Sequence, residues 1–148
     1  MNIAIPLNHN LSFYHDNPIT APQFAIYYID RDSKKNHIHT SLDFIAANPL
    51  NIINQGKYSA SQIKCVCEVE KCSDIHHISE HYLLLESING CEYLLADHYC
   101  NNIQRALING GISIYKIPPF IHKPDNAIKN FLLGALFAST TKQIHYAS

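Results

Sequence analysis

A strand–helix–strand pattern between Cys91 and Ile117 constrains the fold more than any other part of this sequence. Residues 92–96 (EYLLA) form a short run of large apolar side chains, which is typical of a strand buried on both faces. Apolar residues then recur at helical spacing in a stripe that we expect to face a sheet: Cys100, Ile103, Leu107 and Ile108. Gly110-Gly111 would end this helix, and residues 112–117 (ISIYKI) indicate a second strand. Because two strands joined through a helix run parallel, the segment predicts a parallel pair inside an α/β fold.

The turn after the first of these strands is the expected position of a ligand, because open α/β sheets bind ligands at the carboxyl ends of their strands. Asp97 is expected to cap the helix, and His98 and Cys100 bring an imidazole and a thiol into the same turn. The first turn of a helix favours a thiolate, so we predict that His98 and Cys100 bind a cofactor. The alternative is that Cys100 packs under the sheet as a small apolar residue.

Three earlier segments predict further strands. Residues 2–7 (NIAIPL) and 24–30 (FAIYYID) are apolar runs rich in β-branched and aromatic side chains. Residues 37–45 alternate polar and apolar side chains, which indicates a strand with one face in water. The turn residues between the second and third of these segments predict a hairpin.

Two more helices are expected on either side of the strand–helix–strand segment. A helix that starts near Ser73 carries an apolar stripe: Ile75, Ile78, Tyr82, Leu85 and Ile88. Pro118-Pro119 interrupts the chain after the last strand. A final helix, capped by Asp125, carries a second apolar face: Ile128, Phe131, Leu132, Ala135 and Leu136.

This order of elements predicts a ribonuclease H-like α/β fold. Its five-stranded mixed sheet would have three antiparallel and then two parallel strands, flanked by about three helices. We expect one domain over residues 1–138, with an inserted cysteine-containing segment at about residues 48–72. Residues 139–148 are expected to form a flexible tail.

Composition restricts the class of function. The 148 residues are 47% hydrophobic and 16% charged, which is typical of a globular domain. The net charge of −1 gives no electrostatic reason to expect a nucleic acid partner. No apolar run approaches the roughly 20 residues of a membrane span, and the N-terminus lacks a signal-peptide pattern. We therefore expect a cytoplasmic protein without a membrane partner.

Five cysteines and ten histidines are the unusual part of the composition. An odd number of cysteines in a reducing compartment argues against a disulfide framework. Cys65, Cys67 and Cys72 lie within eight residues, and His77 follows them. Thiolate and imidazole suit zinc or an iron–sulfur cluster, so we predict these four residues as metal ligands.

Two observations leave other interpretations open for this cysteine segment. Its spacing matches neither a zinc ribbon nor a ferredoxin run, and Cys65 and Cys67 would share one face of a buried strand. His77 and His81 are four residues apart and could share a metal, although each alone is more often a solvated helix residue.

His15 lies in the loop of residues 9–22 that follows the first strand. In the expected fold the first strand neighbours the fourth, so this loop can reach the turn with His98 and Cys100. We therefore predict His15 as a third cofactor-binding residue, the alternative being a solvated loop histidine. The first strand lacks the carboxylates of a two-metal nuclease, and motifs of nucleotide-binding enzymes and α/β-hydrolases are missing. We expect no enzyme.

Several segments resemble one protein family. Residues 21–30 (APQFAIYYID) are similar to its APxFxIYDID strand, and residues 90–117 resemble its strand, turn, helix and GI-x-V-Y strand. Residues 127–136 resemble its closing helix. The family is that of the NifX/NafY-like dinitrogenase iron–molybdenum cofactor biosynthesis proteins. The similarity covers nearly the whole chain except about residues 48–72.

This resemblance implies a ribonuclease H-like fold and a role in nitrogenase cofactor biosynthesis, hence in nitrogen fixation. Members bind an iron–sulfur cluster or an iron–molybdenum cofactor precursor and pass it from donor to acceptor proteins without being enzymes. The hypothesis for this chain is therefore a non-enzymatic metal-cluster carrier or accessory protein. A zinc-binding structural or regulatory domain, or a metal-free interaction module of the same fold, are the alternatives.

The chain departs from the family pattern in two places. The family's loop histidine falls on Asn17, so His15, two residues earlier, would take its place. The family's glycine-rich turn falls on residues 98–100, where an imidazole and a thiol replace glycines. Both changes add nitrogen or sulfur ligands near the expected site.

Overall fold

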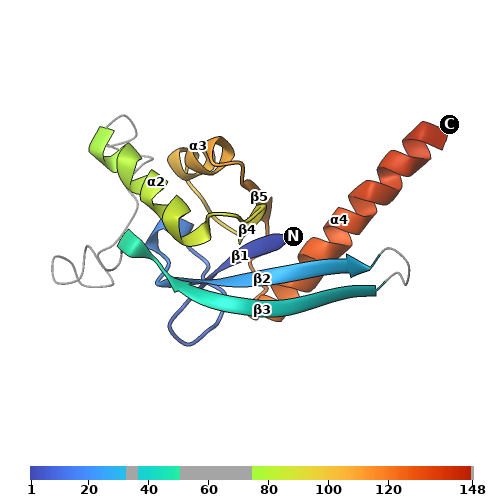
Figure 1. Ribbon diagram of the computed structural model, residues 1–148, viewed down its shortest axis with the longest axis horizontal. Helices are drawn as coiled ribbons and strands as arrows, with labels where there is room; N and C mark the ends of the chain where they lie inside the picture. Colours follow the sequence, from blue (N-terminus) through green and yellow to red (C-terminus); the bar gives the residue numbers. More distant parts are fainter. Residues whose placement is uncertain (33–36, 51–74, 148) are drawn as a thin grey trace.

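The computed structural model describes residues 1–32, 37–50 and 75–147. The helices and strands follow one another along the chain in the predicted order (Figure 1). The elements are β1 (Asn2–Leu7), the 3-10 helix η1 (Pro18–Thr20), β2 (Gln23–Asp32), β3 (His37–Ala47), α2 (Ile75–Ile88), β4 (Tyr93–Ala96), α3 (Asn101–Asn109), β5 (Ser113–Lys116) and α4 (Pro124–Ala147).

The five strands form one mixed sheet in the order β3-β2-β1-β4-β5. β1 pairs with β2, and β2 with β3, in the antiparallel direction, whereas β1–β4 and β4–β5 are parallel pairs. This arrangement confirms the predicted ribonuclease H-like α/β fold. It also places β1 and β4 at the centre of the sheet, with β3 and β5 at its edges.

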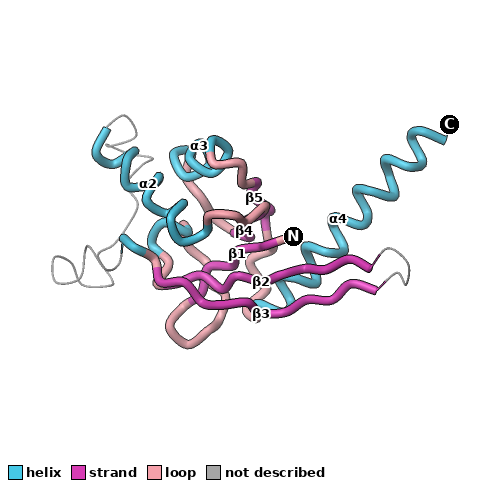
Figure 2. The backbone as a smooth tube through the Cα atoms, in the orientation of Figure 1, coloured by secondary structure: helices cyan, strands magenta, loops and turns pink. Residues whose placement is uncertain are grey.

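Successive side chains of the central strands point to opposite faces of the sheet, so each face has its own apolar core. On one face, Ala4 of β1 and Leu94 of β4 pack with apolar residues of α2 and α3: Leu84, Ile88, Ile103 and Leu107. On the other face, residues of β1 and β4 pack with residues of α4. The strands contribute Ile3, Ile5 and Leu95, and α4 contributes Ala127, Ile128 and Phe131. Figure 2 shows α2 and α3 side by side and apart from α4. β1 and β4 are therefore buried on both faces, as their continuous apolar runs predict.

The start of α3 differs from the prediction. Cys100, rather than Asp97, is the N-cap, and its sulfur accepts a hydrogen bond from the Ile103 amide at 3.5 Å. The assignment of Asp97 as the cap was wrong because three residues separate the end of β4 from the cap. Asp97 stays at the strand end, where its carboxylate is available for another partner.

One residue of each predicted apolar stripe lies outside the core, whereas Ile88 of α2 and Cys100, Ile103 and Leu107 at α3 are buried as predicted. Ile108 of α3 is 61% exposed and Tyr82 of α2 is 39% exposed, so neither faces the core as expected. The buried face of α2 includes His81 and Leu84, which the predicted stripe left out, together with the predicted Ile88. The buried face is therefore turned toward His81 by part of the roughly 100° that separates successive helical residues.

The last helix begins two residues earlier than a cap at Asp125 predicts. Pro124 is its first residue, which suits proline because that position needs no amide hydrogen. Asp125 therefore lies in the first turn and not at the cap, where its charge still complements the helix dipole. α4 continues to Ala147, so helical backbone extends into the segment expected as a tail. Among the described helices, α4 included, none combines the length and apolarity that crossing a membrane requires.

Phe131 provides a test of the α4 side of the core. It is buried, and its ring lies 4.9 Å from that of Tyr93 and 5.0 Å from that of Tyr115 (centroid distances). We expect Phe131→Ala to lower the free energy of unfolding by about 3–5 kcal/mol. Leu133→Ala, at an exposed position two residues along the same helix, should change it by less than about 0.5 kcal/mol. Urea denaturation measures both values, and equal values for the two variants would contradict this packing.

Candidate functional site

Three loops meet at the sheet edge where the parallel strands β1, β4 and β5 end. The loop after β1 contains His15, the end of β4 is followed by Asp97, and the loop after β5 contains His122. Backbone bonds hold the first loop in place: the Tyr14 amide donates to the Pro6 carbonyl at 2.9 Å, and the Phe13 amide donates to the His122 carbonyl at 2.8 Å. The fold thus brings three titratable side chains to one edge.

Asp97 and His15 form the closest contact in this group. Asp97 Oδ2 lies 2.7 Å from His15 Nδ1, and the carboxylate side chain is only 8% exposed against 30% for the imidazole. Because a carboxylate can only accept, Nδ1 of His15 must carry the hydrogen. Nε2 of a neutral His15 then carries a lone pair that can accept a hydrogen bond.

His122 lies on the far side of His15. Its Nδ1 is 3.1 Å from His15 Nε2, and the two rings meet edge to face with centroids 5.0 Å apart. With both rings neutral, His122 Nδ1–H donates to His15 Nε2. Asp97, His15 and His122 therefore form a chain of hydrogen bonds that runs from a buried carboxylate to an exposed imidazole.

The second oxygen of Asp97 is an unusual feature of this chain. Oδ1 is buried, and no hydrogen-bond partner for it exists among the described residues. A buried acceptor without a donor costs about 1–3 kcal/mol. A bound water, an ion or a functional role explains such a group in native proteins, and Asn2 Oδ1 shares this property.

Cys100 and His81 form a separate, buried pair. Cys100 Sγ lies 3.3 Å from His81 Nε2, and both side chains are in the core between α2 and α3. Cys100 therefore packs under the sheet, as the alternative to a ligand role predicts. His81, considered in the sequence as a solvated residue or a metal ligand, is buried instead.

Of the remaining predicted residues, His98 directly follows Asp97, and the others lie outside the described residues or have side chains that are not described. His98 is exposed in the turn between β4 and α3. His77 belongs to α2, but its side chain is not described, and Cys65, Cys67 and Cys72 lie in the segment 51–74, outside the described residues. Within the part of the chain that is described, no three His, Cys, Asp or Glu side chains converge in a way that could hold a metal ion.

His122 is the site residue that sequence reasoning missed. It follows β5 just as His15 follows β1 and Asp97 follows β4. The rule that ligands bind at the carboxyl ends of parallel strands could have identified it. Its loop (IPPFIHKP) has no periodic pattern that would mark this histidine.

Comparison of the sequence with known protein-family models and with curated proteins finds no match.

Cys91 offers a test of the electrostatic environment beside β4. It is buried, and burial raises the pKa of its thiol from 9.0 to about 11. Since only the thiolate reacts, alkylation at pH 8 should be about 100-fold slower in the folded protein than in the urea-unfolded chain. Mass spectrometry of the peptide that contains Cys91, after timed exposure to iodoacetamide, measures this ratio. Equal rates in the two states would contradict the burial of Cys91.

Proposed function

We propose that this protein is a non-enzymatic carrier or accessory protein for a metal cluster, and that His15 and His122 are ligands to the cargo. The observation that supports the proposal is the orientation of His15 by Asp97. Metal-binding histidines commonly donate their second ring nitrogen to a carboxylate, which fixes the ring and raises the basicity of the ligating nitrogen. Asp97 holds His15 in this way at 2.7 Å, with Nε2 directed away from the protein core.

The distance between the two imidazoles also suits a shared metal. Two nitrogen ligands at 2.0–2.1 Å from a tetrahedral metal lie about 3.3 Å apart. His15 Nε2 and His122 Nδ1 are 3.1 Å apart, so only a small movement is needed to admit a metal in place of the shared hydrogen. His122 is exposed, so the cargo can approach from solvent.

Two imidazoles fill only two positions of a bare metal ion and leave the others to water. They suit a preformed iron–sulfur cluster or an iron–molybdenum cofactor precursor, which carries its own sulfur ligands and has few open positions. Further ligands are predicted from the sequence: Cys65, Cys67, Cys72 and His77, with His98 in the neighbouring turn. The resemblance to nitrogenase cofactor biosynthesis proteins suggests the same class of cargo, with donor and acceptor proteins as partners.

An Asp–His pair is also the base of many hydrolases, so catalysis is the natural competing interpretation. In those enzymes Nε2 of the histidine meets the hydroxyl or thiol of a nucleophile. Here Nε2 of His15 meets a second imidazole. This arrangement favours coordination over proton transfer from a nucleophile.

Anaerobic reconstitution with iron and sulfide tests the proposal. Wild type should gain visible cluster absorption with bound iron and sulfide, and the double variant His15→Ala/His122→Ala should lose most of it. Asp97→Asn should weaken binding by about 10–100-fold, because it removes the carboxylate that orients His15. His9→Ala, which removes an exposed histidine from the same loop, should bind as wild type does.

The other outcomes of this experiment identify the alternatives. Cluster binding by the double variant at the wild-type level would refute the role of the two imidazoles. Loss of binding in Cys65→Ser, Cys67→Ser and Cys72→Ser alone would assign the cargo to the cysteine segment. Zinc without iron would support the zinc-binding domain, and a metal-free protein in every condition would support an interaction module.

A further inference from the structure

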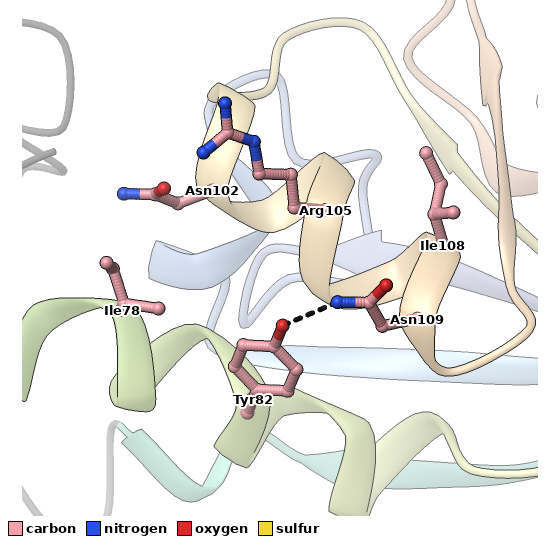
Figure 3. A pocket seen from close by; sticks show the side chains of 6 residues that line it. All are labelled: Ile78, Tyr82, Asn102, Arg105, Ile108 and Asn109. Atoms are coloured by element: carbon pink, nitrogen blue, oxygen red, sulfur yellow. Dashed lines mark hydrogen bonds between the residues drawn. The ribbon is translucent and has the colours of Figure 1, made fainter. Parts of the chain in front are cut away.

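A hollow of about 390 Å³ lies between α2 and α3, apart from the histidine site (Figure 3). Its volume is within the range of about 300–1,000 Å³ that is typical of small-molecule sites. None of His15, Asp97 and His122 lines it. The lining residues come from both helices: Ile78, Tyr82, Asn102, Arg105, Ile108 and Asn109.

Two residues that were expected in the core belong to the apolar part of this hollow. Tyr82 and Ile108 were both predicted to face the sheet, and both line the hollow instead. Exposed apolar side chains that gather in a groove are a feature of ligand-binding sites. Ile78 of α2 extends the same apolar wall.

A hydrogen bond keeps the hollow in shape. Asn109 Nδ2 donates to the Tyr82 hydroxyl at 2.7 Å, across the two helices (Figure 3). The bond fixes the phenol ring, so the apolar wall exists without a ligand. A preformed wall reduces the entropy that is lost on binding.

Arg105 gives the hollow its charge. It is the one charged residue of the lining, it is exposed, and among the described residues no ion pair involves it. A guanidinium group presents several donors in a plane, which matches the oxygens of a carboxylate, sulfonate or phosphate. Figure 3 shows Arg105 and Asn102 at the end of the hollow away from the Tyr82–Asn109 bond.

We propose that the hollow between α2 and α3 binds a small organic anion. The apolar body of the ligand packs on Ile78, Tyr82 and Ile108, and its carboxylate, sulfonate or phosphate group pairs with Arg105. Among the described residues, the lining has one cationic end, an apolar wall and no carboxylate, so charge complementarity selects an anion over a cation.

Two dyes of similar shape test this proposal with the full chain: anionic 8-anilinonaphthalene-1-sulfonate and neutral N-phenyl-1-naphthylamine. We expect saturable binding of the anionic dye, measured by its fluorescence. Arg105→Ala should weaken that binding about tenfold or more and leave the neutral dye unaffected, because it removes a charge-assisted contact. Lys129→Ala, which removes an exposed cation from α4, should leave both dyes bound as in wild type.

Two further variants separate this hollow from other apolar surfaces. Ile108→Asn should weaken both dyes, and its exposed position makes a loss of folding unexpected; unchanged far-UV circular dichroism and unfolding midpoint check this. Phe44→Ser alters an exposed apolar residue of β3 and should change neither dye. The proposal is overturned if Arg105→Ala binds the anionic dye as tightly as wild type, or if only Phe44→Ser reduces binding.

Discussion

Parallel pairing of β1 with β4 is the constraint on which the site depends. The pairing sets Ile3 opposite Tyr93 and Ala4 opposite Leu94, with β5 parallel on the far side of β4. Because the three strands run in one direction, the loops that follow them leave from the same edge of the sheet. His15 and Asp97, 82 positions apart in sequence, meet there and form a charge-assisted hydrogen bond. The bond in turn orients the lone pair of His15 toward His122.

Much of this architecture is predictable because the strands are apolar runs that stand out in the sequence. The run at residues 2–7 is β1 as predicted, and the hairpin and the strand–helix–strand order are also confirmed. The strand-end rule placed His15 and the turn after β4 at one edge. The role of Asp97 was mistaken because a capping carboxylate and a strand-end carboxylate look alike in sequence. Only the three-dimensional position of His15 distinguishes them.

Helix rotation is the part that sequence alone predicted least well. Two stripes are possible on α2: one has Ile78 and Tyr82 in the core, and the other has His81 and Leu84. They differ by a rotation of about one residue. Apolarity favours the first, but the hydrogen bond between His81 and Cys100 makes burial of the imidazole possible. That partner is 19 positions away, so no local pattern reveals it. The same rotation leaves Tyr82 exposed at the hollow between α2 and α3.

Long-range ¹H–¹⁵N NMR of the histidine side chains, before and after addition of Zn²⁺ as a metal probe, tests the central claim most directly. The claim is that Asp97 presents His15 Nε2, together with His122 Nδ1, for coordination. The predicted result is a hydrogen on His15 Nδ1, and metal-induced shifts of His15 Nε2 and His122 Nδ1. A hydrogen on His15 Nε2, or metal-induced shifts at other histidines with none at these two nitrogens, would contradict it.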